Sequence, residues 1–210
     1  MGKHQSLVRN QSSSLVKYSQ KVIVSILNDE GERLSIKQFC YPYFWGWVKE
    51  HFRRSKGVKA WVAANGMRSR GIPSLRPLAL VEKKKWTGLK ESLLFTEAPA
   101  DSQEMDRYIL RGFEDVMRKR SFIRAFARWL GGLHRMGLYH RDMKTCNILV
   151  LEKGETWEFR LLDFEDIYMD EKVNRKNLFR SFLQLNTSTP NVITQADRLR
   201  FFREYLRLNP

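Results

Sequence analysis

Short apolar runs separated by polar turns dominate the first hundred residues, a pattern typical of an antiparallel β-sheet. These runs lie at 6–8, 15–18, 21–27, 34–39, 78–81 and 92–95. Between the fourth and fifth runs the spacing becomes helical over 55–69, and the helix ends before Gly71 and Pro73 because neither residue continues a helix. The N-terminal half therefore predicts a small antiparallel sheet with one main helix, and the charged segment 82–91 is predicted to be a loop between the last two strands.

The C-terminal half has mostly helical spacing. The predicted helices are 105–118, 121–136 and 175–208. The apolar positions of the second helix fall on one face, as expected of a core helix, and they are Ile123, Phe126, Leu130 and Leu133. Between the second and third helices, apolar runs at 147–151 and 159–164 predict two strands joined by a polar turn.

A small, polar, proline-containing segment at 96–103 separates the strand-rich half from the helical half. We therefore predict one α+β domain with two lobes. The N-terminal lobe covers 1–97, a hinge covers 98–103, and a small, mostly helical lobe with a catalytic β-hairpin covers 104–210.

The composition is strongly basic, with 38 Lys and Arg against 23 Asp and Glu and a formal net charge of +15. This excess implies a polyanionic partner, which could be nucleic acid, an anionic membrane or a phosphorylated substrate. No zinc-finger or RNP-type motif occurs, so no nucleic-acid partner is expected. Cys40 and Cys146 fit neither a metal-site nor a disulfide pattern, and no apolar run is long enough to cross a bilayer. These features predict a cytoplasmic chain.

The segment 140–147 reads HRDMKTCN and carries the clearest chemical signal. Asp142 and Asn147 have the H-R-D-x-x-x-x-N spacing that places a catalytic carboxylate and a metal ligand at opposite ends of one loop. Asp163 follows Asn147 by 16 residues at the end of an apolar run, where a second carboxylate could reach the same metal ions. Lys37 lies in an early apolar strand, as the phosphate-binding lysine of a kinase does. Together these residues indicate phosphoryl transfer, which depends on positioning and charge neutralisation.

Several blocks of the chain resemble the bacterial lipopolysaccharide kinases of the Kdo/WaaP type, which are distant relatives of protein kinases. The blocks are IKQF at 36–39, RSRGIPSLRPLAL at 68–80, LHRMGLYHRDMKTCNILV at 133–150, RLLDFEDI at 160–167 and DRLRFFREYL at 197–206. The resemblance covers most of the chain. It implies a two-lobed, protein-kinase-like fold and a phosphotransferase that uses ATP and Mg²⁺.

The resemblance also implies roles for individual residues. Asp142 would be the base or the acceptor-orienting carboxylate, and Lys144 would contact the transferred phosphate. His140 and Arg141 would brace the loop rather than react. The implied Mg²⁺ ligands are Asn147 and Asp163.

For the nucleotide, the resemblance implies that Lys37 pairs with the α- and β-phosphates, and that adenine packs on the hinge through backbone groups near Glu97 and Ala98. The usual glycine-rich loop over the phosphates is missing. In its place stand hydroxyl side chains that could donate to phosphate, namely Ser12, Ser13 and Ser14.

Two further departures concern the acidic residues. Glu165 replaces the glycine of the Asp-Phe-Gly motif, so the backbone freedom of glycine is absent there. The range 51–81, which includes the predicted helix, contains no Asp or Glu, so the usual glutamate partner of Lys37 is not found. Glu50 and Glu82 flank this range and are the nearest candidates.

The chain ends 47 residues beyond Asp163 and contains no Ala-Pro-Glu motif in that part, which favours an acceptor smaller than a peptide. The resemblance implies a sugar hydroxyl of Kdo or heptose in the lipopolysaccharide inner core, carried on Kdo-lipid A. A small atypical protein kinase and a catalytically inactive binding module remain open alternatives.

Basic residues mixed with aromatic ones over 44–59 suit a peripheral position on an anionic membrane, or equally a solvated face over core aromatics. Further cations in the tail could contact acceptor phosphates or form a solvated helix surface, and they are Arg175, Lys176, Arg180, Arg198 and Arg200. We expect the chain to lie on the cytoplasmic face of the inner membrane, with no obligate protein partner.

Overall fold

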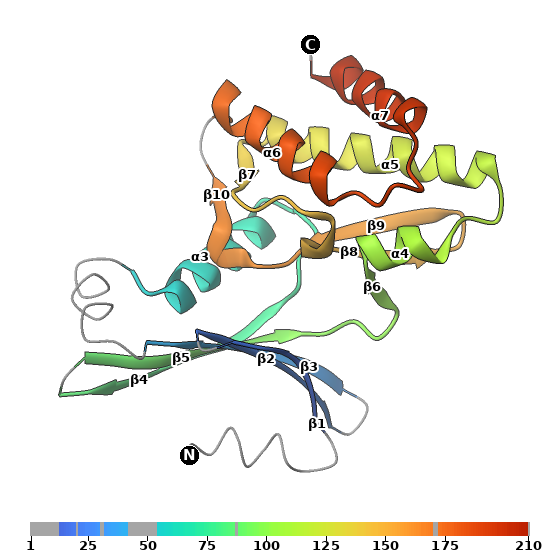
Figure 1. The fold of residues 1–210 in the computed structure, drawn as a ribbon. Helices are drawn as coiled ribbons and strands as arrows, with labels where there is room; N and C mark the ends of the chain where they lie inside the picture. The colour runs from blue at the N-terminus through green and yellow to red at the C-terminus, as the bar shows by residue number, and fades with distance from the viewer. Residues whose placement is uncertain are drawn as a thin grey trace. The chain divides into compact units, whose positions relative to one another are not determined.

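A five-stranded antiparallel sheet in the order β1–β2–β3–β5–β4 forms the base of the first unit (Figure 1). Its strands are β1 (Ser13–Tyr18), β2 (Val22–Asp29), β3 (Glu32–Cys40), β4 (Pro77–Lys85) and β5 (Gly88–Glu97). The computed structural model describes residues 13–19, 21–29, 32–41, 54–86, 88–169 and 172–209, so the predicted strand at 6–8 lies outside the described residues. This first unit extends to Ala100, except that residues 71–74 belong to the second unit, which continues from Asp101.

The prediction of a loop over 82–91 is wrong, because β4 continues to Lys85 and β5 begins at Gly88. Lys83 lies opposite Glu91 in the strand register, and the Lys83 Nζ is 3.1 Å from the Glu91 Oε1. Opposite charges at facing positions stabilise a strand pair. Lys83 and Glu91 are therefore paired across the two strands, which the local density of charge along the chain does not reveal.

Helix α3 (Lys56–Ser69) packs against β4 and β5. Ser55 caps its first turn, because its hydroxyl accepts a hydrogen bond from the Val58 N–H at 3.0 Å. At Gly57 the helix comes so close to the sheet that a Cβ would lie 2.6 Å from Ser92 Oγ and 2.9 Å from Leu80 Cδ1. An alanine fits this contact only if Ser92 and Leu80 move.

Replacing Gly57 by alanine is expected to lower the free energy of unfolding by about 1–3 kcal/mol, because the added methyl group overpacks the contact between helix and sheet. Gly132 in helix α5 (Val116–Arg135) is the matched control, since a Cβ there meets nothing within 4 Å. Gly132→Ala should stabilise the chain by about 0.4–1 kcal/mol. Chemical denaturation of both variants measures the two effects, and equal signs would contradict the close contact at Gly57.

The second unit is mainly helical, but two predicted helix boundaries are wrong. Its helices are α4 (Met105–Arg111), α5 (Val116–Arg135), α6 (Arg175–Ser188) and α7 (Gln195–Leu208). Within the predicted helix 105–118, Gly112 has a φ of 91° and Asp115 caps α5 by accepting the Arg118 N–H at 2.7 Å. The predicted helix 175–208 is broken because Thr194 and Asp197 form a capping box at the start of α7.

Helix α5 packs against the hairpin of β8 (Ile148–Lys153) and β9 (Thr156–Leu161), confirming the two predicted strands. Phe122 and Phe126 are buried on α5, and their ring centroids lie 5.5 and 5.4 Å from that of Phe159 on β9. Shorter strands complete the unit, namely β6 (Ser102–Glu104), β7 (Leu138–His140) and β10 (Ile167–Met169). The core of this unit is therefore a helix resting on the hairpin that follows the H-R-D segment.

His134 on α5 is buried, and its Nδ1 lies 2.8 Å from the Tyr205 hydroxyl on α7. Burial lowers the pKa of His134 from 6.5 to about 4. Because the unfolded chain binds the proton more tightly, stability is retained above pH 6.5 and is lost as the pH falls toward 4, by about 3 kcal/mol in total. Denaturation curves across this window should show a shallower loss for His134→Gln, and an unchanged slope would remove His134 as the cause.

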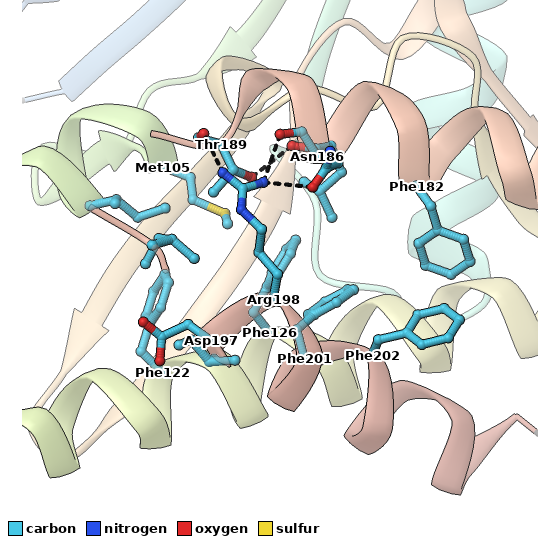
Figure 2. Close-up of a pocket in the computed structure, with 14 residues that line it drawn as sticks. Met105, Phe122, Phe126, Phe182, Asn186, Thr189, Asp197, Arg198, Phe201 and Phe202 are labelled. Atoms are coloured by element: carbon cyan, nitrogen blue, oxygen red, sulfur yellow. Dashed lines mark hydrogen bonds between the residues drawn. The ribbon is translucent and has the colours of Figure 1, made fainter. Parts of the chain in front are cut away.

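An apolar pocket of about 300 Å³ lies among the helices of the second unit (Figure 2). Most of its wall is aromatic or aliphatic, including Met105, Phe122, Phe126, Phe182 and Leu185. At one side Arg198 donates hydrogen bonds to the Asn186 carbonyl at 2.7 Å and the Thr189 carbonyl at 3.0 Å (Figure 2). The pocket thus combines an apolar interior with a fixed guanidinium.

Candidate active site

His140 ends strand β7 and anchors the H-R-D loop from within the core. Its side chain is completely buried, its Nδ1 accepts the Asp142 N–H at 3.1 Å, and its Nε2 lies 2.9 Å from the Leu162 carbonyl. Since a backbone N–H can only donate, the ring proton is on Nε2, which donates to Leu162. Burial lowers the pKa of His140, although the Leu162 carbonyl and nearby carboxylates oppose this effect. A neutral imidazole therefore ties the loop to the end of β9, and this fits the bracing role predicted for His140.

Arg141 makes the second anchor, on the surface. Its N–H donates to the Asp166 carbonyl at 2.8 Å, and its guanidinium lies 2.5 Å from the Asp166 carboxylate. Asp166 belongs to the short 3-10 turn Phe164–Asp166 that follows Asp163. The loop and the Asp-Phe-Glu segment are consequently joined by both backbone and charge.

The Asp142 carboxylate is held by three side chains. Its Oδ1 lies 2.8 Å from the Lys144 Nζ and accepts from the Gln184 amide at 3.3 Å, and its Oδ2 accepts from the Asn147 amide at 3.2 Å. The hydrogen bond to Asp142 is the main reason that the pKa of Lys144 is raised. Asp142 is 34% exposed in its side chain, so it remains open to an acceptor. The structure thus brings together the two residues predicted to be catalytic, Asp142 and Lys144.

Asn147 is one of the two predicted Mg²⁺ ligands. Its amide nitrogen donates to the Asp142 carbonyl at 2.8 Å, so its amide oxygen points away from that carbonyl. The amide oxygen lies 3.8 Å from the Cys146 sulfur. Asparagine and carboxylate oxygens are ligands that Mg²⁺ accepts. Within the part of the chain that the structure describes, no three His, Cys, Asp or Glu side chains form a metal cluster. The Asn147 amide oxygen and the Asp163 carboxylate would leave further positions on a Mg²⁺ ion for nucleotide phosphates, and Mg²⁺ is commonly bound in this way.

Asp163 lies in the left-handed backbone region, with φ 54° and ψ 53°. It is the only residue other than glycine with positive φ among those that the structure describes. This backbone conformation is uncommon for residues other than glycine and is often found at functional sites. The special backbone position therefore falls on the predicted Mg²⁺ ligand itself, while Glu165 sits in the regular 3-10 turn that follows.

Lys37 lies in β3, half-buried, with its Nζ 5.3 Å from the Phe39 ring centroid. Of the two acidic candidates for pairing with it, Glu50 lies outside the described residues. Glu82 accepts a hydrogen bond from the Ser55 hydroxyl at 2.6 Å and is 3.6 Å from the Lys84 Nζ. Glu82 is therefore engaged at the start of α3, where it supports the helix cap.

The other residues predicted to bind nucleotide also belong to the first unit. The Glu97 N–H donates to the Arg76 carbonyl at 3.0 Å and the Ala98 N–H donates to the Arg33 carbonyl at 2.9 Å. These two N–H groups are thus already bonded, so adenine recognition there would depend on other backbone groups. Ser12 lies outside the described residues. Ser13 and Ser14 are the first residues of β1, a strand rather than a loop, and their side chains are not described.

Gln184 and Ser188 on α6 are site residues that the sequence did not reveal. Gln184 accepts the Met143 N–H at 3.1 Å while its amide donates to Asp142. Ser188 accepts the Thr145 N–H at 3.0 Å, and the Thr145 hydroxyl donates to the Ser188 carbonyl at 2.8 Å. Their spacing of four places both on one side of α6. That side of α6 fixes the backbone of the H-R-D loop.

Comparison with known proteins supports the fold class predicted from the sequence. The solved structure of WaaP in complex with acyl carrier protein is similar over 99% of this chain and 84% of that chain, with a TM-score of 0.70 and 19% sequence identity. That likeness establishes a two-lobed, kinase-like fold, so the predicted fold class is confirmed.

A family model described as the lipopolysaccharide kinase (Kdo/WaaP) family matches residues 47–205, and the chain belongs to this family. It is similar to the lipopolysaccharide core heptose(I) kinase WaaP of Pseudomonas aeruginosa, with 22% identity over 78% of this chain, and to that of Escherichia coli, with 24% identity over 70%. The aligned region spans 66% and 58% of the length of these two relatives.

Proposed function

We propose that the chain is an ATP-dependent kinase that phosphorylates a sugar hydroxyl, of Kdo or heptose, in the lipopolysaccharide inner core. The observation that carries this proposal is the set of bonds that orients Asp142, shared among Lys144, Asn147 and Gln184. A carboxylate held in this way can accept the proton of an incoming hydroxyl and direct it toward phosphorus. The names of the curated relatives support a core-sugar acceptor, and the reaction is proposed for the cytoplasmic face of the inner membrane.

Each residue of the loop has a distinct part in this proposal. Asp142 orients the acceptor hydroxyl and takes its proton, and Lys144, which is 45% exposed, shifts from Asp142 toward the transferred phosphoryl group. Asn147 and Asp163 would hold Mg²⁺, which when bound neutralises charge on the nucleotide phosphates. Lys37 would pair with the α- and β-phosphates. None of the described helices is long and apolar enough to cross a membrane.

Labelled ATP, Mg²⁺ and two acceptors, Kdo-lipid A and its heptosylated form, test this function. We expect label in the lipid extract, and its dependence on heptose identifies the sugar. Label found on protein while both glycolipids stay unlabelled would instead support the atypical protein kinase. Absence of label on either, with ATP bound, would support the inactive binding module.

We also propose that the chain binds an acyl carrier protein, a partner that its sequence did not predict. The apolar pocket of about 300 Å³ supports this, because its lining suits an acyl chain and Arg198 lies at its side. Calorimetry with acylated and unacylated carrier protein measures the contribution of the acyl group to binding. Tighter binding of the acylated form is expected, and equal affinities would contradict a role for the pocket.

A further inference from the structure

Helix α6 has a solvent-facing side that mixes cations with exposed apolar residues. The helix contains three cations and no Asp or Glu. One side, away from the buried Ser181 and Leu185, is exposed and is made of Arg175, Lys176, Phe179, Arg180 and Leu183. Phe179 is 71% exposed and Leu183 is 52% exposed. We call this set the α6 outer surface.

The structure separates the basic residues of the tail into two groups. Arg198 donates to the carbonyls of Asn186 and Thr189, and Arg200 lies 2.8 Å from the Asp197 carboxylate. Arg198 therefore links α7 to the end of α6, and Arg200 is paired within α7. The three cations of the α6 outer surface are exposed and make no ion pair with another described residue. Their exposure places them where an external anion could reach them.

We propose that the α6 outer surface docks the chain on an anionic lipid surface, with Phe179 and Leu183 entering the headgroup region and the three cations contacting lipid phosphates. Apolar side chains interleaved with Lys and Arg are the pattern of interfacial helices, and each cation near an anionic membrane contributes attraction. An acidic protein would also attract the cations. It would, however, need an apolar site placed opposite Phe179 and Leu183, which a lipid surface does not. The inference rests on the proposed function, because an enzyme that acts on a lipid-anchored acceptor must reach the membrane surface.

The docking helix is also the helix that holds the catalytic carboxylate. Gln184 and Ser188 bond the H-R-D loop from one side of α6, and the outer surface occupies another side of the same helix. A helix with its side chains is about 10 Å across. Docking would therefore hold Asp142 on the order of 10 Å from the headgroups, within the reach of the first sugars attached to a lipid anchor.

Vesicle co-sedimentation tests the proposal with the full chain. Phosphatidylcholine vesicles are compared with vesicles that also contain phosphatidylglycerol, and the wild type should bind the second kind alone. Replacing Arg175, Lys176 and Arg180 by glutamine should weaken that binding about 100-fold, from about 1 kcal/mol for each cation. A triple variant of α3, Lys56→Gln, Lys59→Gln and Arg68→Gln, removes the same charge from exposed positions, two of them in the basic and aromatic segment 44–59. The docking proposal predicts that it binds like the wild type, and a loss of binding would favour the segment 44–59 as the membrane contact.

Phe179→Ser with Leu183→Ser separates docking from chemistry. Binding to anionic vesicles should fall at least about tenfold, and phosphorylation of vesicle-embedded acceptor should fall with it, while turnover of a water-soluble core sugar is retained. Val116→Ser with Met117→Ser, at positions 56% and 59% exposed on α5, is the matched control. If the wild type phosphorylates no sugar but the α6 variants still lose vesicle binding, the proposed function fails and the docking surface stands.

Two outcomes would overturn the docking surface. One is wild-type vesicle binding by both α6 variants, especially if the α3 variant loses it. The other is unchanged vesicle binding with lost binding of purified acyl carrier protein, which would make the α6 outer surface a protein interface.

Discussion

Asp142→Asn is expected to lower kcat by about 100- to 10,000-fold, the contribution typical of a positioned general base. The asparagine amide keeps the size of the carboxylate but cannot take the acceptor proton. It also loses the charge that pairs with Lys144 at 2.8 Å. The nucleotide dissociation constant should stay near that of the wild type, because the role of Asp142 is confined to the acceptor.

Asp115→Asn is the control for this change, because asparagine caps a helix as well as aspartate does and Asp115 serves as the cap of α5. Its kcat should equal that of the wild type. Steady-state kinetics together with nucleotide binding by calorimetry measure both variants. Wild-type turnover by Asp142→Asn would exclude Asp142 from the mechanism.

Gln184→Leu is expected to lower kcat about 10- to 100-fold with little change in the KM for ATP. Leucine keeps most of the volume but breaks two bonds, to the buried Met143 N–H at 3.1 Å and to Asp142 at 3.3 Å. A hydrogen bond to a charged group contributes about 1.5–3 kcal/mol, which corresponds to this range of rates. Gln184 acts through Asp142 and is a positioning residue.

Ser188→Ala is the matched variant on the same side of α6, since it loses the bond to the Thr145 N–H but does not touch Asp142. Both variants should lose a similar amount of stability in denaturation experiments. A purely structural role for Gln184 predicts equal kinetic effects in the two variants. If Gln184 positions Asp142, kcat falls far more in Gln184→Leu than in Ser188→Ala.

The local parts of the site could be predicted from the sequence. Asp142 and Asn147 are close in the chain, so their spacing alone places them on one loop, and the structure joins them by hydrogen bonds at 2.8 and 3.2 Å. The hairpin after them was also predictable from its apolar runs. Gln184 was not, because it meets Asp142 only when α6 folds back from 42 positions later.

The ends of the helices were the features predicted least accurately from the sequence. Gly112 and Asp115 carry stop and start signals, but the helical spacing of the apolar residues continues across them and hid the break. The charged ends of β4 and β5, which continue both predicted strands into 82–91, were missed for a related reason. Pairing of Lys83 with Glu91 is a property of the sheet register, which no local pattern contains.

Mass spectrometry of the glycolipid acceptor after reaction with ATP and Mg²⁺ is the most direct test of the central claim, which is sugar phosphorylation directed by Asp142. We predict a phosphate on a core-sugar hydroxyl with the wild type, and little or none in the same time with Asp142→Asn. An unmodified acceptor with the wild type, or equal phosphorylation by both proteins, would contradict the account.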